Sequence, residues 1–266
     1  MTDAVSAVIL GIVEGLTEFL PVSSTGHLII VNKYIYFGEQ FTKMFDIVIQ
    51  LGAILSVVIY FRKKLIPFGK EVSESDRKDI FDTWKKAIVG VIPALVIGAA
   101  VHDYIEQYLF TPVVVSITLI IWGIFLIIID RGDRTGRFNS IKEITYTTAI
   151  LIGFIQCLSM VPGTSRSAAT IIGAMLLGVS RIAAVEYSFF LSIPTMVAAS
   201  GYSLLKSGLS MNAHEAVTLS IGFIVSFFVA WMVIAFFMKY ITSHDFRPFG
   251  YYRIILGIIV LIWLVI

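Results

Sequence analysis

Long stretches of apolar residues constrain the fold of this chain more than any other feature. Six of them approach or reach the length of a bilayer-spanning helix, and they lie at about residues 44–61, 87–101, 113–129, 183–205, 216–238 and 254–266. Hydrophobic residues make up 58% of the chain and charged residues only 14%, against about a quarter in soluble domains. The sequence therefore predicts an all-α polytopic membrane protein with a single membrane domain over residues 1–266.

Two further apolar segments, at about 4–37 and 147–180, are interrupted in the middle. The first break reads LPVSSTG (20–26) and the second break reads VPGTSRS (161–167). Proline ends the incoming helix, and serine or threonine caps the outgoing one. Each half is short for a full crossing, so each segment is predicted to be a re-entrant helical hairpin, which is tolerated only where protein or a water-filled cavity surrounds it.

The two broken segments resemble each other in sequence. Matching residues are Gly11 with Gly153, Glu14 with Gln156, Leu16 with Leu158, Thr17 with Ser159 and, after a gap of one, Pro21 with Pro162, Ser23 with Thr164 and Ser24 with Ser165. In this alignment Thr25 lies opposite Arg166. The chain is therefore predicted to contain two repeats, 1–130 and 145–266, each a re-entrant hairpin followed by three crossings. Because three is odd, the second repeat enters from the opposite side, as in an inverted-topology repeat.

The distribution of lysine and arginine predicts the orientation. The segments 62–86, 130–146 and 239–253 hold eight, four and three basic residues, whereas 102–112 holds none and 206–215 holds one. Basic segments stay in the cytoplasm. Both termini are then on the outer side, and the two breaks are expected to meet near the middle of the membrane.

Glu14 and Glu18 lie four residues apart on one face of the first hairpin helix. An ionisable group at membrane depth costs about 2.5–3.5 kcal/mol on insertion scales, and like charges at this spacing repel. The pair could share a proton, bind a cation or lie solvated at the edge of a water-filled entrance. A divalent cation, Mg²⁺ or Ca²⁺, is favoured because hard cations take carboxylate oxygens. The two acids also argue against a cleavable signal peptide.

A histidine and a run of hydroxyl groups follow in the same hairpin. His27 lies one turn beyond Ser23, Ser24 and Thr25. A lone histidine is often structural, and helix capping explains one hydroxyl but not three in succession. We therefore expect chemistry here.

Arg166 lies at the second break, where a midplane position makes snorkelling to the interface a poor explanation. A guanidinium group grips phosphate with two parallel hydrogen bonds, and the following helix start offers free N–H groups. The neighbours expected to contact the same anion are Gly163, Thr164, Ser165, Ser167 and Thr170, with Ser23 and Thr25 from the first hairpin.

The motifs EGLTEFLPVSSTGH (14–27) and PGTSRSAAT (162–170) resemble the two signature motifs of the undecaprenyl pyrophosphate phosphatase family of the bacitracin-resistance type. The resemblance covers essentially the whole chain. It implies hydrolysis of the lipid pyrophosphate to the monophosphate and inorganic phosphate, which recycles the carrier lipid for cell-wall synthesis and confers bacitracin resistance. It also implies the bacterial inner membrane, a divalent cation and a site open to the outer side.

The expected catalytic residues are Glu14, Glu18, Ser24, His27 and Arg166, with Glu14 and Glu18 also as metal ligands. Three mechanisms stay open: Ser24 as nucleophile with His27 as base or acid, direct attack by His27, or attack by a metal-activated water.

The rival function is a transporter or lipid flippase, for which inverted repeats are typical but which needs no adjacent nucleophile and base. Nucleic-acid binding is not expected, because no basic patch with interleaved aromatics occurs. Gly173, Ala174 and Gly178 would allow close helix packing within one chain or in a homo-oligomer.

Overall fold

The computed structural model describes residues 2–69, 72–130, 136–207 and 211–265. This part of the chain is built from helices and contains no strand, which confirms the predicted all-α fold. The elements in chain order are α1 (Asp3–Thr17), α2 (Ser24–Val31), α3 (Glu39–Tyr60), α4 (Arg62–Leu65), α5 (Glu74–Tyr108), α6 (Pro112–Ile129), η1 (Ile141–Glu143), α7 (Tyr146–Gln156), η2 (Cys157–Met160), α8 (Arg166–Leu176), α9 (Arg181–Ser207), α10 (Ala213–Tyr240) and α11 (Arg247–Val265).

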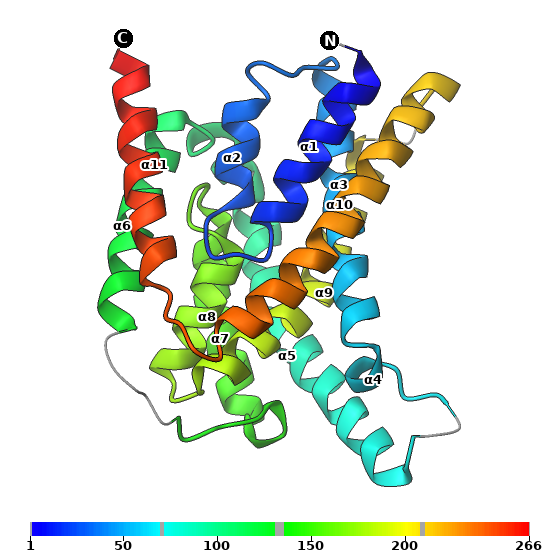
Figure 1. Ribbon diagram of the computed structural model, residues 1–266, viewed down its shortest axis with the longest axis vertical. Coiled ribbons are helices and arrows are strands. Elements are labelled where there is room, and N and C mark those ends of the chain that lie inside the picture. Colours follow the sequence, from blue (N-terminus) through cyan, green and yellow to red (C-terminus); the bar gives the residue numbers. More distant parts are fainter. Residues whose placement is uncertain (1, 70–71, 131–135, 208–210, 266) are drawn as a thin grey trace.

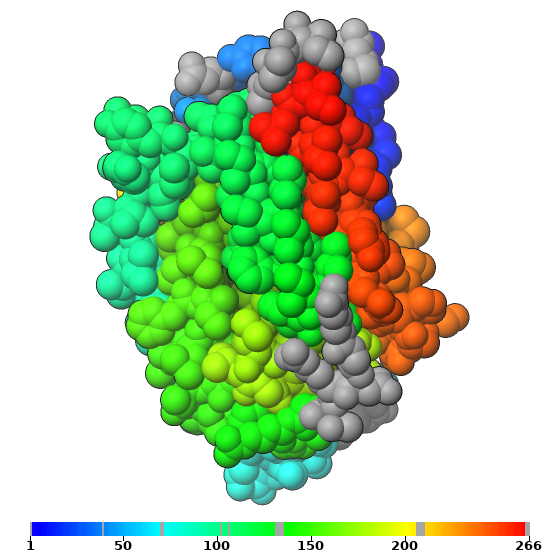
Figure 2. Space-filling view, turned by 90° about the vertical axis from the view of Figure 1, so that its left-hand side faces the viewer, coloured from blue at the N-terminus to red at the C-terminus, as the bar shows by residue number. Residues whose placement is uncertain are grey.

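Five helices in the described part are long and apolar enough to cross a membrane. They contain the segments Gln40–Tyr60, Glu74–Val101, Pro112–Ile129, Arg181–Leu205 and Ala213–Tyr240. Five of the six predicted crossings are therefore confirmed by length and hydropathy. The sixth, at 254–266, falls in α11, which is not among these five but packs along α6 (Figure 2).

The predicted loops 62–86 and 102–112 are wrong in part, because helix α5 occupies much of both. Its N-terminus is fixed by Ser73, whose Oγ accepts from the N–H of Asp76 at 3.1 Å, with acidic residues in the first turn. From there the helix continues for 35 residues to Tyr108. Polar capping and acidic side chains extend the helix well beyond its apolar segment.

The two broken segments each form two short helices that are joined at the break. In both, the residue before the second helix has a positive φ, 73° at Ser23 and 74° at Ser165, and its Oγ accepts an N–H from three residues further on. Such a backbone conformation costs about 1–3 kcal/mol in a non-glycine residue, so the surroundings must hold it.

These caps correct the sequence alignment of the two breaks by one residue. Since Ser23 and Ser165 have the same conformation and the same capping role, Ser24 is the structural equivalent of Arg166. The alignment had placed Thr25 there. The sequence alignment was based on matching single serines. The backbone conformation instead shows which residues start the two helices.

The short helix α2 lies between α11 and α1 (Figure 1), and one side of α1 and of α7 is exposed, at Leu16 and Phe154 for example. Helix α1 packs against α10 and α3, and α8 packs against α7, α9 and α6. Close approach depends on glycine: a Cβ at Gly123 or at Gly250 would lie 2.7 Å from the other's carbonyl oxygen, where α6 meets α11. Gly173 similarly faces Ile155, and Ala174 is fully buried, so these small residues serve packing within the chain.

Helix α4 and the start of α5 lie at one end of the molecule, and both ends of the chain lie at the opposite end (Figure 1).

This arrangement predicts which surface positions share a side of the membrane. Single cysteines at Lys78 and Lys142, in a Cys157→Ala background, should resist a membrane-impermeant maleimide in intact cells. Cysteines at Tyr108 and Asn212 should react, because they lie at the end that carries the termini. Permeabilised cells are the control, in which all four should react. Equal labelling of Lys78 and Tyr108 positions in intact cells would contradict the predicted topology.

Candidate active site

The two breaks lie directly against each other, as predicted. Ser167 Oγ, from the second break, donates a hydrogen bond to the backbone oxygen of Leu20 in the first break at 2.9 Å. Residues about 147 positions apart in the chain therefore form one continuous site.

Arg253 of α11 holds both breaks in place. Its Nη1 donates to the carbonyl oxygen of Pro21 at 3.1 Å, and its Nη2 donates to those of Gly163 at 2.6 Å and Thr164 at 2.9 Å. The side chain is completely buried. Broken helices leave carbonyl groups without partners, and a guanidinium group has enough donors in one plane to satisfy several of them.

The sequence analysis missed this role and counted Arg253 as a residue of a cytoplasmic segment. That assignment is wrong because α11 begins at Arg247, so Arg253 lies in its second turn and points toward α6. Pro248 is the signal that was overlooked, since proline is favoured in the first turn of a helix.

Arg166 pairs across the two breaks with Glu18. Its Nη2 lies 2.8 Å from Glu18 Oε1, and its Nη1 donates to the backbone oxygen of Ser188 at 3.1 Å. Nε is buried and has no hydrogen-bond partner. Arg166 is thus a nearly buried cation whose Nε–H has no acceptor in the described part of the chain.

The other oxygen of Glu18 binds the serine that starts α2. Ser24 Oγ donates to Glu18 Oε2 at 2.6 Å. One carboxylate therefore bridges a serine hydroxyl and an arginine. This is the geometry of a base beside a candidate nucleophile, with a cation beside both.

His27 faces away from Ser24. Its Nδ1 lies 2.7 Å from the carbonyl oxygen of Ser23, and its Nε2 lies 2.6 Å from the hydroxyl of Tyr252, on whose ring it stacks. A carbonyl only accepts, so Nδ1 carries a proton and donates it to Ser23. The structure places Glu18, rather than His27, beside Ser24.

Glu14 is fully buried, and neither of its carboxylate oxygens has a hydrogen-bond partner. Both oxygens of Glu18 are already engaged. In the described part of the chain, no group of three or more His, Cys, Asp or Glu side chains is arranged to hold a metal ion. Of the two acids, Glu14 is the one with carboxylate oxygens available to a cation.

A cavity of about 240 Å³ opens at the junction of the breaks. The predicted site residues that line it are Glu18, Ser23, Ser24, Thr25, Gly163, Ser165 and Arg166. Gln50 of α3 and Met196 of α9 also line it, and nothing in the sequence had indicated them. The cavity thus draws polar groups from both hairpins and from the long helices around them.

The remaining predicted site residues do not line this cavity. They are Glu14, His27, Thr164, Ser167 and Thr170. Thr170 Oγ1 bonds the backbone oxygen of Arg166 at 2.9 Å and the hydroxyl of Ser188 at 2.6 Å, and Ser167 bonds Leu20 as described. These two residues therefore stabilise the second break without lining the cavity.

Gly163 shows why the second break contains glycine. Its φ is 87°, and a Cβ there would lie 2.1 Å from Thr118 Oγ1 on α6. A side chain at this position would push the break away from α6 and from Arg253. Glycine therefore allows the second break to lie close to α6.

Fold and cavity together define a helical membrane protein with a buried site suited to an anion such as phosphate, formed where two helix N-termini meet. Residues 7–259 match the family described as bacitracin resistance protein BacA. An undecaprenyl-diphosphatase of Enterococcus faecalis is 48% identical over 266 residues, covering 98% of this chain and 96% of the relative. Undecaprenyl-diphosphatase 1 of Clostridium acetobutylicum is 49% identical, covering 99% and 98%. The chain belongs to this family.

Removing the Arg253 guanidinium should loosen both breaks together. Arg253→Ala leaves buried carbonyl groups without donors, and we expect it to lower the free energy of unfolding by about 3 kcal/mol. Thermal unfolding in detergent measures the effect. Arg247→Ala, an exposed arginine on the same helix, is the control. Equal unfolding temperatures for the two variants would contradict a role of Arg253 in holding the breaks.

Proposed function

We propose that this protein hydrolyses undecaprenyl pyrophosphate to undecaprenyl phosphate and inorganic phosphate. The observation that carries the proposal is the contact of Ser24, Glu18 and Arg166 at the junction of the two breaks. Relatives about 47–49% identical over nearly the whole chain are named undecaprenyl-diphosphatases, which supports the same substrate here.

Ser24 is the proposed nucleophile. Its Oγ forms a bond to the terminal phosphorus, and the bond from that phosphorus to the bridging oxygen breaks, which releases the lipid monophosphate. Glu18 Oε2, 2.6 Å from Ser24 Oγ, takes the hydroxyl proton. The phosphate stays on Ser24 as an ester.

Water completes the reaction. The oxygen of a water molecule forms a bond to the phosphorus of the phosphoserine while the bond from that phosphorus to Ser24 Oγ breaks. Both water protons leave with the phosphate as dihydrogen phosphate, and Ser24 Oγ regains the proton that Glu18 holds. The same carboxyl group therefore acts first as a base and then as an acid. This requires no second titrating residue beside Ser24.

Arg166 stabilises the charge that develops on the phosphoryl oxygens. Its Nε is unpartnered and buried, and its ion pair with Glu18 can exchange for phosphate oxygens as the substrate enters. The first residues of α2 and α8, Ser24 and Arg166, both line the cavity. Preorganised donors in a low-dielectric site supply most of the stabilisation in phosphoryl transfer.

His27 acts as a positioning residue. Its bonds to the Ser23 carbonyl and to Tyr252 tie the cap of α2 to α11, which fixes the start of the helix where Ser24 lies. Direct attack by His27 is not favoured, because both ring nitrogens are engaged away from the cavity.

A divalent cation, Mg²⁺ or Ca²⁺, fits the buried oxygens of Glu14, which have no protein donor. When bound with the substrate it would neutralise charge on the pyrophosphate. Glu14 and Glu18 are the side chains that would hold the cation.

The cellular role follows from the reaction. We propose a multi-pass protein of the bacterial inner membrane whose two re-entrant hairpins form an inverted-topology repeat and whose cavity opens to the outer side. Recycling of the carrier lipid would support peptidoglycan synthesis, and overproduction would raise bacitracin resistance. A transporter or flippase on the same fold would leave the contact of Ser24 and Glu18 without a purpose.

The charge at the second break should be essential for catalysis. Arg166→Ala should lower phosphate release from a detergent-solubilised polyprenyl pyrophosphate about a thousandfold, as for other arginines that stabilise phosphoryl transfer. A chelator should abolish release by the wild type, and added Mg²⁺ or Ca²⁺ should restore it. Release that persists in Arg166→Ala would mean that phosphate binds elsewhere.

Removing the hydroxyl group of Ser24 tests whether this residue is the nucleophile. Ser24→Ala should lower kcat about a thousandfold or more, since the covalent route is lost. Rapid quenching of wild type with substrate labelled at the terminal phosphate should trap a phosphoserine at position 24. Ser220→Ala, which removes an exposed hydroxyl on α10, is the control. Near-normal turnover by Ser24→Ala would exclude this mechanism and favour attack by water.

A further inference from the structure

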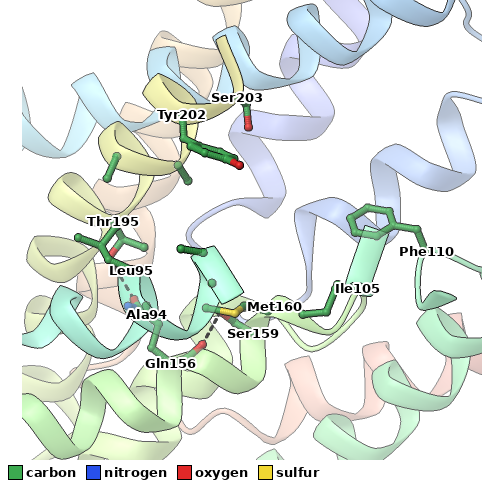
Figure 3. Close-up of a pocket in the computed structure, with 14 residues that line it drawn as sticks. Ala94, Leu95, Ile105, Phe110, Gln156, Ser159, Met160, Thr195, Tyr202 and Ser203 are labelled. Atoms are coloured by element: carbon green, nitrogen blue, oxygen red, sulfur yellow. Dashed lines mark hydrogen bonds between the residues drawn. The ribbon is translucent and has the colours of Figure 1, made fainter. Parts of the chain in front are cut away.

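A second cavity, of about 450 Å³, lies beside the polar one between α5, η2 and α9 (Figure 3). Its walls are mostly hydrocarbon. The space exists because the facing positions of α5 and α9 carry small residues, namely Gly98, Ala99, Ala198 and Ala199. Leu95 and Ile105 of α5 provide larger apolar surfaces.

The two cavities adjoin each other. Phe110, Ser159, Met160 and Ala199 line both of them. A molecule with a charged head among Ser24 and Arg166 would therefore have an apolar space immediately next to it. This is the shape of a site for an amphiphile.

Most polar groups in the apolar wall are used inside the protein. Thr195 Oγ1 donates to the backbone oxygen of Leu191 at 2.7 Å, and Ser159 Oγ donates to that of Gln156 at 2.6 Å. Gln156 Oε1 accepts from Thr195 at 3.3 Å, and its Nε2 has no partner. The wall consequently offers little to a polar ligand.

We propose that this second cavity binds the isoprene units of the lipid tail that lie nearest the pyrophosphate. The inference rests on the proposed function and assigns the tail to the gap between α5 and α9. A hydrocarbon is the one occupant that matches both the apolar wall and the junction with a phosphate site. The cavity therefore makes the enzyme selective for tails over free pyrophosphate.

Short prenyl pyrophosphates provide the test. They dissolve in water, and binding removes the apolar surface of their tails from water. Each buried methylene group favours binding about fourfold. For the wild type, kcat/KM should rise at least tenfold for each unit from one to three isoprene units. If the wild type releases no phosphate from any prenyl pyrophosphate, including the long ones, the proposed function itself fails.

Filling the cavity should reduce this rise. Ala99→Phe from the α5 wall and Ala198→Phe from the α9 wall should lower kcat/KM for the three-unit substrate at least tenfold more than for the one-unit substrate. Ala100→Phe is the matched control, since Ala100 is exposed and lines neither cavity. A rise that survives undiminished in both cavity variants would overturn the proposal.

Cross-linking tests the wild type without any substitution. A prenyl pyrophosphate with a photoreactive group on its second isoprene unit should label residues within 94–105 or 195–203. Excess polyprenyl pyrophosphate should prevent the labelling. Labelling confined to α1, α10 or α11 would place the tail elsewhere and overturn the assignment.

Discussion

The structure depends on two buried arginines that join the two broken helices. In a membrane interior no water replaces the hydrogen bonds that a helix loses where it breaks. Arg253 donates to the carbonyl groups of both breaks, and Arg166 pairs with the carboxylate just before the first. At the starts of α2 and α8, the serine caps accept one backbone N–H group each. Other N–H groups of the first turns are available to the proposed anion. The same breaks that destabilise the helices thus create the binding site.

The two helix starts have the same backbone and different side chains. Ser24 and Arg166 occupy equivalent positions after caps with φ near 74°, and the contact through Glu18 brings them together. One broken segment therefore supplies the proposed nucleophile and base, and the other supplies the arginine. Glu14 and its counterpart Gln156 divide similarly: one faces a charged neighbour, and the other lines the apolar cavity. The two breaks thus share a backbone conformation and differ in the side chains that they present to the cavity.

The chemistry of the substrate is matched by two adjoining environments. A polar cavity of about 240 Å³ meets an apolar one of about 450 Å³, and α9 contributes to both. A lipid pyrophosphate has the same division between head and tail. The proposed tail site therefore depends on small residues of α5 and α9, as the proposed phosphate site depends on charged ones.

Length and hydropathy in the sequence determined the helical membrane fold, because about twenty apolar residues in a row have few other stable environments. Costly polar residues in apolar segments, such as Glu18 and Arg166, identified the site for the same reason. Only the tertiary structure decided the partners: it placed Glu18 beside Ser24, turned His27 toward Tyr252 and buried Arg253 between the breaks. Local sequence predicts where a helix breaks, but a hydrogen bond between residues more than two hundred positions apart depends on how the helices pack.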